Sequence, residues 1–368
     1  MNGSAPLPVA PRRALVVTMR FLGDALLSTP LVHALKQRFP DCAVDVLTFA
    51  GTEAAFEGNR DVAQVIVVPE AATSMQTLRQ AQALWRHYDL AVIAQTGTRP
   101  FLFGWAGGRH RLGLVAPDLG KSWWKRALLH SYAVFDGRGA RVLENQRLAQ
   151  LLGVDALPAV VPPTAGWGAR DIEAALGFAP VSTRFAIVHP APRWRYKQWT
   201  AEGWRALVRA LAVQGLRVVI TGGPGGTEKA YLDGVLAGLE PGTLLRVDGR
   251  WSFAQTADVL HHALLYVGPD TATTHLAAAC GTPVLALYGP TDPALWGPWP
   301  AREGAAYARV AMQQRRGNVI LLQNPELTCV PCQLEGCERH RESYSQCLDR
   351  LPAERVIAAA RRLLGAPR

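Results

Sequence analysis

Apolar residues along the chain switch repeatedly between two spacings. The run 14–18 predicts a strand, and the helical spacing of apolar residues from Leu27 to Phe39 predicts the helix that follows it. Further strand or helix patterns lie at 43–49, 63–69, 75–88 and 89–95. Because strands that alternate with helices form parallel βαβ units, we expect an α/β protein.

The alternation is interrupted once, in the stretch 157–168 (LPAVVPPTAGWG), which is rich in proline and glycine. After it, strand and helix patterns resume at 184–191, 201–215, 216–223, 256–263, 264–270, 274–281 and 283–290. We therefore predict two α/β domains, residues 1–165 and 166–368. Two such domains are expected to hold their chemistry in a cleft between them.

Composition narrows the class of protein. Of the 368 residues, 49% are hydrophobic and 18% charged, which is typical of a globular chain. No eighteen consecutive apolar residues occur, so we expect a cytoplasmic protein without a membrane-spanning helix. The net charge of +10 fits nucleic acid, but no nucleic-acid motif accompanies it, and we predict none as a partner. The basic cluster 121–126 (KSWWKR), with its two tryptophans, suits the surface of an anionic membrane or an acidic substrate.

The segment 270–292 (DTATTHLAAACGTPVLALYGPTD) carries the clearest chemical signal. Asp270 ends a predicted strand, and four polar or small residues lead into a helix near His275: Thr271, Ala272, Thr273 and Thr274. A helix N-terminus leaves backbone N–H groups unpaired at the positive end of the helix dipole. With the hydroxyls, these groups predict an anion site suited to phosphate. A single N-cap would explain one of these residues but not the whole set.

Three other loops end strands in a similar way. In 189–199 (HPAPRWRYKQW), Lys197 with Arg193 or Arg195 is a candidate for neutralising a diphosphate. Gly222 and Gly223 leave a backbone that a ligand can approach closely. In 19–30, Gly23 permits a tight turn, and Asp24 beside it is either a helix cap or a general base.

Four of the six cysteines lie close together, at Cys329, Cys332, Cys337 and Cys347. Because disulfides are disfavoured in the cytoplasm, this spacing favours a structural tetrahedral metal site with zinc or iron. Four protein ligands leave no open position for catalysis. Cys42 and Cys280 are expected to be buried small apolar residues.

The segments 20–40, 189–199 and 268–299, together with the cysteine cluster, resemble the family 9 glycosyltransferases, the bacterial heptosyltransferases. This resemblance runs in order over nearly the whole chain. It implies a GT-B architecture of two Rossmann-like domains facing across a cleft, the N-terminal one binding the acceptor and the C-terminal one the nucleotide sugar. It also implies an ADP-heptose donor, a lipopolysaccharide core or other glycan acceptor, inversion at the anomeric carbon and no catalytic metal or cofactor. Peripheral contact with the inner face of the inner membrane would suit such an acceptor.

The resemblance also assigns residue roles. Asp24 matches the family's proposed general base, Lys197 the lysine at the donor phosphates, and Asp270 the acidic residue at the sugar. Thr271, Thr274 and His275 fall in the diphosphate loop. Where the family reads Asp-Thr/Ser-Gly, this chain has Ala272, whose Cβ penalises a positive φ and approaches the phosphate position.

Three alternatives remain open. The acceptor could be protein serine or threonine hydroxyls, as in the autotransporter heptosyltransferases. The donor could be another nucleotide sugar, which the Ala272 substitution leaves open. The chain could also be a non-catalytic nucleotide-binding protein, although such a protein has no need of a base at Asp24.

Overall fold

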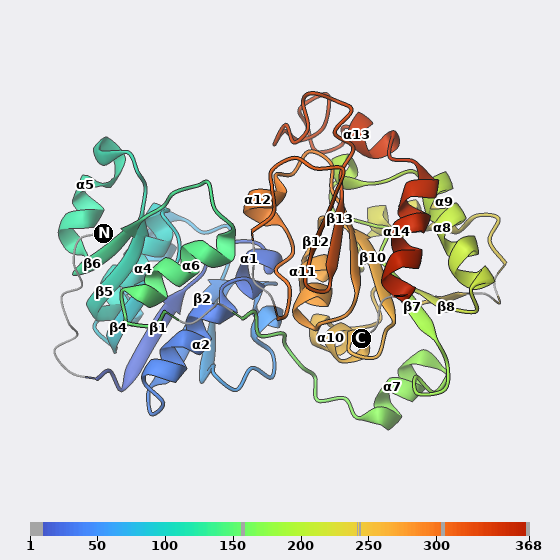
Figure 1. Cartoon of the computed structure of the whole chain (residues 1–368). Coiled ribbons are helices and arrows are strands. Elements are labelled where there is room, and N and C mark those ends of the chain that lie inside the picture. The colour runs from blue at the N-terminus through green and yellow to red at the C-terminus, as the bar shows by residue number, and fades with distance from the viewer. Residues whose placement is uncertain (1–9, 156–158, 241, 243, 303–305, 366–368) are drawn as a thin grey trace. The chain divides into compact units, whose positions relative to one another are not determined.

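The chain forms two compact units that divide between Pro163 and Thr164 (Figure 1). The computed structural model describes residues 10–155, 159–240, 242, 244–302 and 306–365. Both units are α/β, with a largely parallel sheet between helices, so the predicted fold class is confirmed. No helix among these residues is long and apolar enough to span a bilayer.

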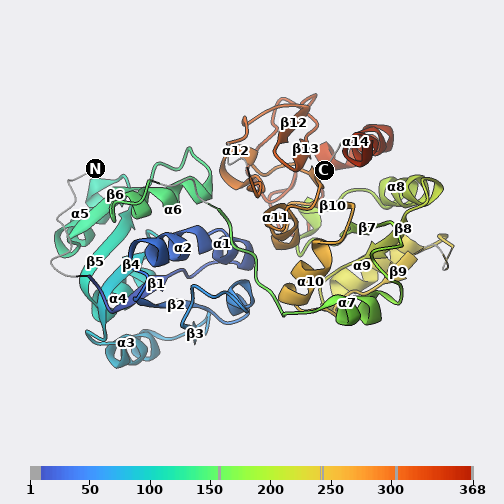
Figure 2. The ribbon, with the colours of Figure 1, turned by 60° about the horizontal axis from the view of Figure 1, so that its bottom comes forward.

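The first unit contains a six-stranded parallel sheet in the order β3-β2-β1-β4-β5-β6. Its strands are β1 (Arg13–Val17), β2 (Ala43–Phe49), β3 (Gln64–Val68), β4 (Tyr88–Ile93), β5 (Gly108–Val115) and β6 (Ser131–Val134). Its helices are α1 (Leu22–Leu26), α2 (Thr29–Arg38), the 3₁₀ turn η1 (Glu53–Phe56), α3 (Ser74–Ala83), α4 (Thr98–Gly107), α5 (Leu119–Leu128) and α6 (Arg141–Gln150). Helices α2 and α6 cover one face of the sheet, and α3 and α4 cover the other (Figure 2).

The second unit contains a seven-stranded sheet in the order β12-β13-β11-β10-β7-β8-β9, in which only β12 runs antiparallel. Its strands are β7 (Phe185–Val188), β8 (Arg217–Ile220), β9 (Leu244–Arg246), β10 (Leu265–Pro269), β11 (Val284–Leu287), β12 (Gln313–Arg316) and β13 (Val319–Leu322). Its helices are α7 (Ala169–Leu176), the 3₁₀ turn η2 (Arg195–Lys197), α8 (Ala201–Val213), α9 (Gly226–Leu236), α10 (Phe253–Leu260), α11 (Ala272–Ala279), α12 (Pro293–Trp296), α13 (Gln346–Asp349) and α14 (Ala353–Gly365).

In each sheet the strand order reverses at one place, between β1 and β4 in the first and between β7 and β10 in the second. Loops leaving the carboxyl ends of the two strands at such a point diverge to opposite faces and leave room for a ligand. The loop after β1 carries Asp24, and the loops after β7 and β10 carry Lys197 and Asp270. The fold therefore brings these candidate residues to the two switch points.

Two buried tryptophans pack in the core of the second unit. The rings of Trp199 and Trp204 meet edge to face with centroids 5.0 Å apart. The Trp199 indole N–H donates to the carbonyl of Leu351, just before α14, at 2.9 Å. This contact fixes the end of the Lys197 loop against the C-terminal helix.

The start of the second unit is held by one carboxylate. Asp258, buried in α10, accepts hydrogen bonds from the Thr164 hydroxyl at 2.6 Å and from the amides of Ala165 and Trp167 at 3.0 and 2.9 Å. We expect Asp258→Ala to lower the free energy of unfolding by about 2–3 kcal/mol, because hydrogen bonds to a charged group are lost. Guanidinium denaturation measures the change.

Asp155→Ala is the control, since that aspartate is exposed and lies nine residues before Thr164, the start of the segment that Asp258 holds. Its effect should stay within about 0.5 kcal/mol. Equal midpoints for the two variants would contradict the role assigned to Asp258.

Candidate functional site

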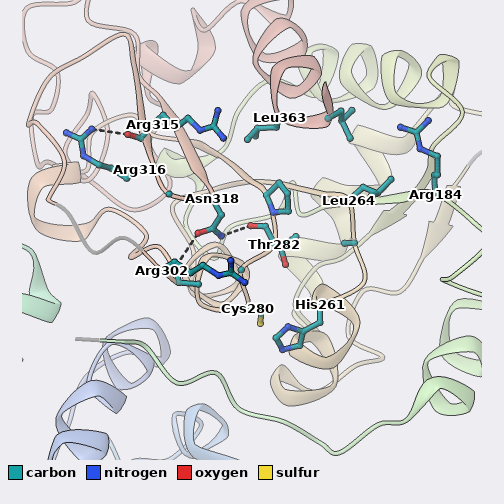
Figure 3. Close-up of a pocket in the computed structure, with 16 residues that line it drawn as sticks. Arg184, His261, Leu264, Cys280, Thr282, Arg302, Arg315, Arg316, Asn318 and Leu363 are labelled. Atoms are coloured by element: carbon teal, nitrogen blue, oxygen red, sulfur yellow. Dashed lines mark hydrogen bonds between the residues drawn. The ribbon is translucent and has the colours of Figure 1, made fainter. Parts of the chain in front are cut away.

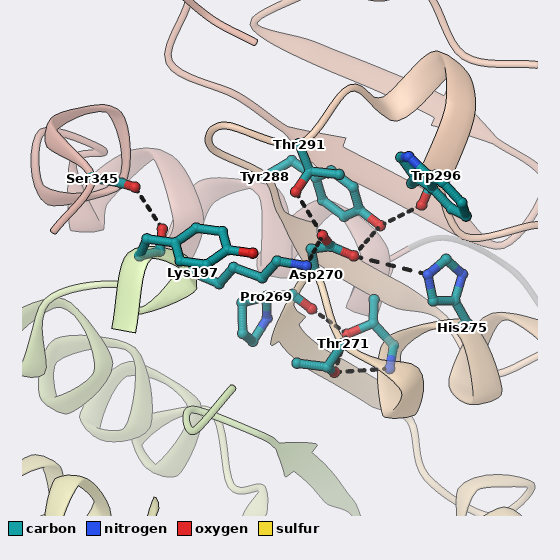
Figure 4. Close-up of polar contacts among 11 residues, drawn as sticks. Lys197, Pro269, Asp270, Thr271, His275, Tyr288, Thr291, Trp296 and Ser345 are labelled. Atoms are coloured by element: carbon teal, nitrogen blue, oxygen red, sulfur yellow. Dashed lines mark hydrogen bonds and ion pairs between the residues drawn. The ribbon is translucent and has the colours of Figure 1, made fainter. Parts of the chain in front are cut away.

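Asp270 is a buried carboxylate at the carboxyl end of β10, and four side chains converge on it (Figure 4). Lys197 Nζ and Thr291 Oγ1 donate to its Oδ2 at 2.6 and 2.7 Å. The Tyr288 hydroxyl donates to Oδ1 at 3.4 Å, and His275 Nε2 lies 3.9 Å from the same oxygen. Asp270 thus joins the loops that follow β7, β10 and β11.

The charges at this centre are set by burial and by the lysine. Burial by itself raises the pKa of Asp270, but Lys197, His275 and the hydrogen bonds from Lys197 and Thr291 outweigh it and hold the pKa below its ordinary value. Burial lowers the pKa of His275 to about 4, against the opposing effect of Asp270. At neutral pH the centre therefore contains a carboxylate, an ammonium group and a neutral imidazole.

The N-terminus of α11 lies beside this pair. Thr271 is its N-cap, and its hydroxyl accepts the Thr274 amide at 3.3 Å. Within the described residues, the amides of Ala272 and Thr273 make no hydrogen bond. His275 Nδ1 is buried and has no partner in that part of the chain either. Two amides at this helix end therefore remain unpaired, as does the buried ring nitrogen of His275.

Thr274 takes a structural role in this loop. It is fully buried, and its hydroxyl donates to the Pro269 carbonyl and contacts the Tyr266 hydroxyl at 3.0 Å. These contacts tie the first turn of α11 to β10. The Thr274 side chain thus shapes the helix end from inside the fold, whereas Thr271 and Thr273 are half-buried at its surface.

Ala272 is the first residue of α11. Among the described residues, non-glycine positions with positive φ are Arg86, Gln333 and Arg339. The loop accordingly does not need the conformation that only glycine adopts readily, and Ala272 carries no backbone strain. Compared with glycine, Ala272 therefore adds only a methyl group beside the unpaired amides.

The glycine loop after β8 is stabilised within its own unit. A Cβ on Gly223 would come within 2.1 Å of a Glu228 carboxylate oxygen, and the Gly223 amide bonds to that carboxylate. Burial raises the pKa of Glu228, and the positive charge of Arg193 counteracts this. Gly222 packs against Leu232, where a Cβ would meet Cδ1 at 2.5 Å. Both glycines thus lie against the ends of side chains from their own unit, and their proposed role at a ligand stays a prediction.

Asp24 and Gly23 belong to the first unit, in the first turn of α1. Phe21 is the N-cap and makes no side-chain cap bond, so Asp24 is not the cap of this helix. Its carboxylate is largely buried and pairs with Arg20, whose Nε lies 3.2 Å from Oδ1. The nearby charge of Asp24 also raises the pKa of buried Arg141, although burial lowers that pKa more.

A cavity of about 1210 Å³ lies elsewhere in the second unit (Figure 3). It is bordered by Arg184, Leu264, Pro283 and Asn318, which directly precede strands β7, β10, β11 and β13 in that order. These positions form the amino edge of the sheet, opposite the edge that carries Asp270. Cavity size and the polar cluster therefore identify different places, and the convergence of chemistry favours the carboxyl edge.

The structure gives no support to the predicted metal site at the cysteine cluster. Cys347 is buried in the apolar core, and burial, reinforced by the other three thiols, raises its pKa to about 12. Cys329 and Cys337 are exposed. In the described residues no three His, Cys, Asp or Glu side chains are placed to share an ion. The structure therefore does not support zinc or iron at Cys329, Cys332, Cys337 and Cys347.

Several residues of the two centres were missed by sequence reasoning. Tyr288 and Thr291 follow a predicted strand in the same segment as Asp270, so the alternation of elements was a usable signal for them. Arg20 lies one helical turn before Asp24 but looked like an ordinary loop residue. Arg141 lies 117 positions after Asp24, and no sequence pattern links the two.

Comparisons with known proteins agree on one family. The model of glycosyltransferase family 9 (heptosyltransferase) matches residues 77–322. Lipopolysaccharide heptosyltransferase 3 of Escherichia coli is 27% identical over 294 residues, covering 76% of this chain and 84% of that protein. The structure of E. coli ADP-heptose lipopolysaccharide heptosyltransferase II superposes with a TM-score of 0.73 at 20% identity, covering 96% and 98% of the two chains. E. coli heptosyltransferase WaaC with ADP gives a TM-score of 0.68 at 21% identity, covering 95% and 99%.

The Lys197–Asp270 pair generates a prediction for stability. Lys197→Met should lower the free energy of unfolding at pH 7 by about 3 kcal/mol, because a buried carboxylate loses its cation. In the variant, burial raises the folded-state pKa of Asp270, so the penalty should shrink as the pH falls toward 4 and the carboxyl group is protonated. In the wild type the depressed pKa of Asp270 keeps its carboxylate ionised, so the ion pair with Lys197 stabilises the fold down to a lower pH. Denaturation at pH 7 and pH 4.5 measures both effects.

The double variant Lys197→Met/Asp270→Asn is the control, since it removes both charges. It should be more stable at pH 7 than Lys197→Met alone and should lack the pH dependence of that variant. A Lys197→Met penalty that is independent of pH would show that the lysine acts through packing and not through Asp270.

Proposed function

Because the chain belongs to glycosyltransferase family 9, the heptosyltransferases, we propose that it transfers a heptose from ADP-heptose to an inner-core acceptor of lipopolysaccharide. The observation that carries this proposal is the Lys197–Asp270 pair beside the open first turn of α11. An ammonium group, two unpaired amides and the dipole of an eight-residue helix are suited to a diphosphate. Relatives named as lipopolysaccharide heptosyltransferases, and a solved structure with ADP, support this choice of substrates.

In the proposed donor complex, Lys197 lies between Asp270 and the diphosphate. Asp270 holds the ammonium group in place before the donor arrives, so little reorganisation is needed when negative charge develops on the leaving group. The amides of Ala272 and Thr273 bind phosphate oxygens, and neutral His275 donates or accepts at its unpaired Nδ1. Asp270 and Thr291 also offer oxygen atoms to sugar hydroxyls.

The proposed reaction is a single displacement. Asp24 accepts the proton of the acceptor hydroxyl while that oxygen attacks the anomeric carbon, and the bond from this carbon to the diphosphate oxygen breaks. ADP leaves with the bonding electron pair, and the configuration at the anomeric carbon inverts. These groups supply both proton transfer and charge stabilisation, so the proposal needs no catalytic metal or cofactor.

The acceptor of the proposed reaction is carried by a membrane lipid. We therefore place the protein in the cytoplasm, with peripheral contact to the inner face of the inner membrane. The first unit, which carries Asp24, is proposed to bind the acceptor, and the second, which carries Lys197 and Asp270, the donor.

Calorimetric titration with ADP, UDP, GDP and CMP tests the donor. We expect selective micromolar binding of ADP, weakened at least about tenfold in Lys197→Ala, because the phosphates lose their cation. Arg209→Ala, which removes an exposed cation on α8, is the control and should bind ADP as the wild type does. Preference for UDP or GDP would reject the heptose assignment, and no binding to any nucleotide would favour a non-catalytic chain.

Substitution of Asp24 tests the base. Asp24→Asn keeps the size of the side chain but cannot accept the proton, so kcat should fall about 10²–10⁴-fold. Its affinity for ADP should match the wild type, because Asp24 belongs to the other unit. Turnover of an ADP-heptose donor by this variant at close to the wild-type rate would exclude Asp24 as the base.

A further inference from the structure

Helix α3 is amphipathic in the reverse of the usual sense. A helix on a sheet normally buries its large apolar side chains. In α3 the buried side chains are Thr77 and Ala81, whereas Met75 and Leu78 are more than half exposed. Trp85, just after the helix, continues the exposed stripe and is 54% exposed. Its large apolar groups therefore face away from the sheet that supports it.

Helix α5 shows the same reversal. Its buried residues are Ser122 and Lys125, and the Lys125 ammonium donates to the Thr96 carbonyl inside the fold. Leu119 and Trp123, one turn apart, are 63% and 65% exposed, and Leu128 is 40% exposed. A tryptophan this exposed on a well-formed helix lacks the apolar surroundings that its ring favours.

The two helices belong to one layer. Right-handed crossovers place α3, α4 and α5 on the same face of the first sheet, opposite α2 and α6 (Figure 2). Helix α3 packs on α4, and Phe101 of α4 meets Trp124 of α5 edge to face at 5.0 Å. We call the exposed side chains of this layer the outer apolar face: Met75, Leu78, Trp85, Leu119, Trp123 and Leu128.

A groove and an excess of positive charge accompany the outer apolar face. Between α3 and α4 lies a hollow of about 540 Å³, lined by Leu78, Trp85, Leu102 and Trp105 among others. Residues 74–130 contain eight Lys or Arg and two Asp or Glu, and the exposed ones among them are Arg79, Arg86, Arg109, Lys121 and Asp118. Arg79 and Lys121 are exposed on the same two helices.

We propose that the outer apolar face docks on an anionic phospholipid bilayer, which deepens the proposed function by naming the surface that holds the enzyme near a lipid-borne acceptor. Exposed tryptophan and leucine side chains on an amphipathic helix enter the headgroup region, where the indole N–H stays hydrated. The surrounding arginine and lysine side chains are attracted to lipid phosphates. Apolar groups and positive charge together match this one occupant.

A second copy of the chain fits the face less well. A two-fold interface would bring the same patch of each copy together, and thus the exposed Arg79 and Lys121 of one copy near those of the other. Like charges across an interface oppose association. The charge of the layer therefore favours an anionic surface.

Co-sedimentation with vesicles tests the proposal. The full-length chain should bind vesicles of phosphatidylglycerol and phosphatidylcholine, bind pure phosphatidylcholine at least about tenfold more weakly, and lose affinity as salt rises. Trp85→Ser/Trp123→Ser should weaken binding to the anionic vesicles by about tenfold or more, because the anchoring rings are gone. Arg79→Gln/Lys121→Gln, which leaves the apolar groups intact, should weaken it and reduce the salt dependence.

The matched control is Val181→Ser/Val213→Ser, which removes two valines of the second unit that are 93% and 87% exposed. This variant should bind vesicles as the wild type does. ADP titration of every variant reports on the integrity of the second unit, and circular dichroism reports on the whole chain.

Two results would overturn the proposal. One is vesicle binding that is absent in the wild type or unchanged in the tryptophan variant. The other is an oligomer, detected by analytical ultracentrifugation, that the tryptophan substitutions dissociate, because the face would then join two copies. Either result alongside normal ADP binding would leave the proposed function standing, whereas loss of ADP binding by the wild type would count against that function alone.

Discussion

The second unit is organised around the ion pair between Lys197 and Asp270. A carboxylate as buried as Asp270 is costly unless a cation and hydrogen bonds compensate for its lost hydration. Here the cation comes from the loop after β7 and a hydroxyl from the loop after β11, so one side chain fixes three loops at the switch point of the sheet. The Trp199–Leu351 hydrogen bond then secures the lysine loop against the C-terminal part of the chain. Any ligand at this edge meets groups that are already in place.

Much of this arrangement follows from the order of elements. Strand and helix periodicity predicted the α/β class, and the rule that ligands bind at carboxyl ends of parallel strands pointed to the loops that carry Lys197 and Asp270. The direct contact between these two residues was not predictable, because it requires β7 and β10 to be neighbours in the sheet, and 76 residues of chain lie between the two strands. The resemblance had placed Lys197 at the phosphates of the donor and Asp270 at its sugar, without a contact between them.

Polar residue type was a weaker guide than position. Thr274 and Thr271 look alike in sequence, yet the first is fully buried and bonded to β10, whereas the second caps α11 at the surface. Of the two concerns about Ala272, the one about a positive φ does not apply, because this residue begins a regular helix. The four cysteines were grouped by spacing; the other three thiols do act on the pKa of Cys347, but Cys347 packs into the apolar core and no three ligand side chains of the described residues are placed to share an ion. Spacing specifies which residues are near in the chain and leaves the direction of each side chain open.

The same limit applies to amphipathic helices. The pattern at 75–88 predicted a helix, and an amphipathic helix on a sheet ordinarily turns its apolar stripe to the core. A hydrophobic period identifies a stripe without saying what covers it. In α3 and α5 the buried residues are small or polar, and although Trp124 packs inward on Phe101, Met75, Leu78, Leu119 and Trp123 stay exposed. The buried Lys125 shows how far this inversion goes, since its ammonium group needs the Thr96 carbonyl inside the fold while Trp123 beside it remains in water. The exposed tryptophan and leucine side chains are the part of this arrangement that contact with a membrane surface would bury.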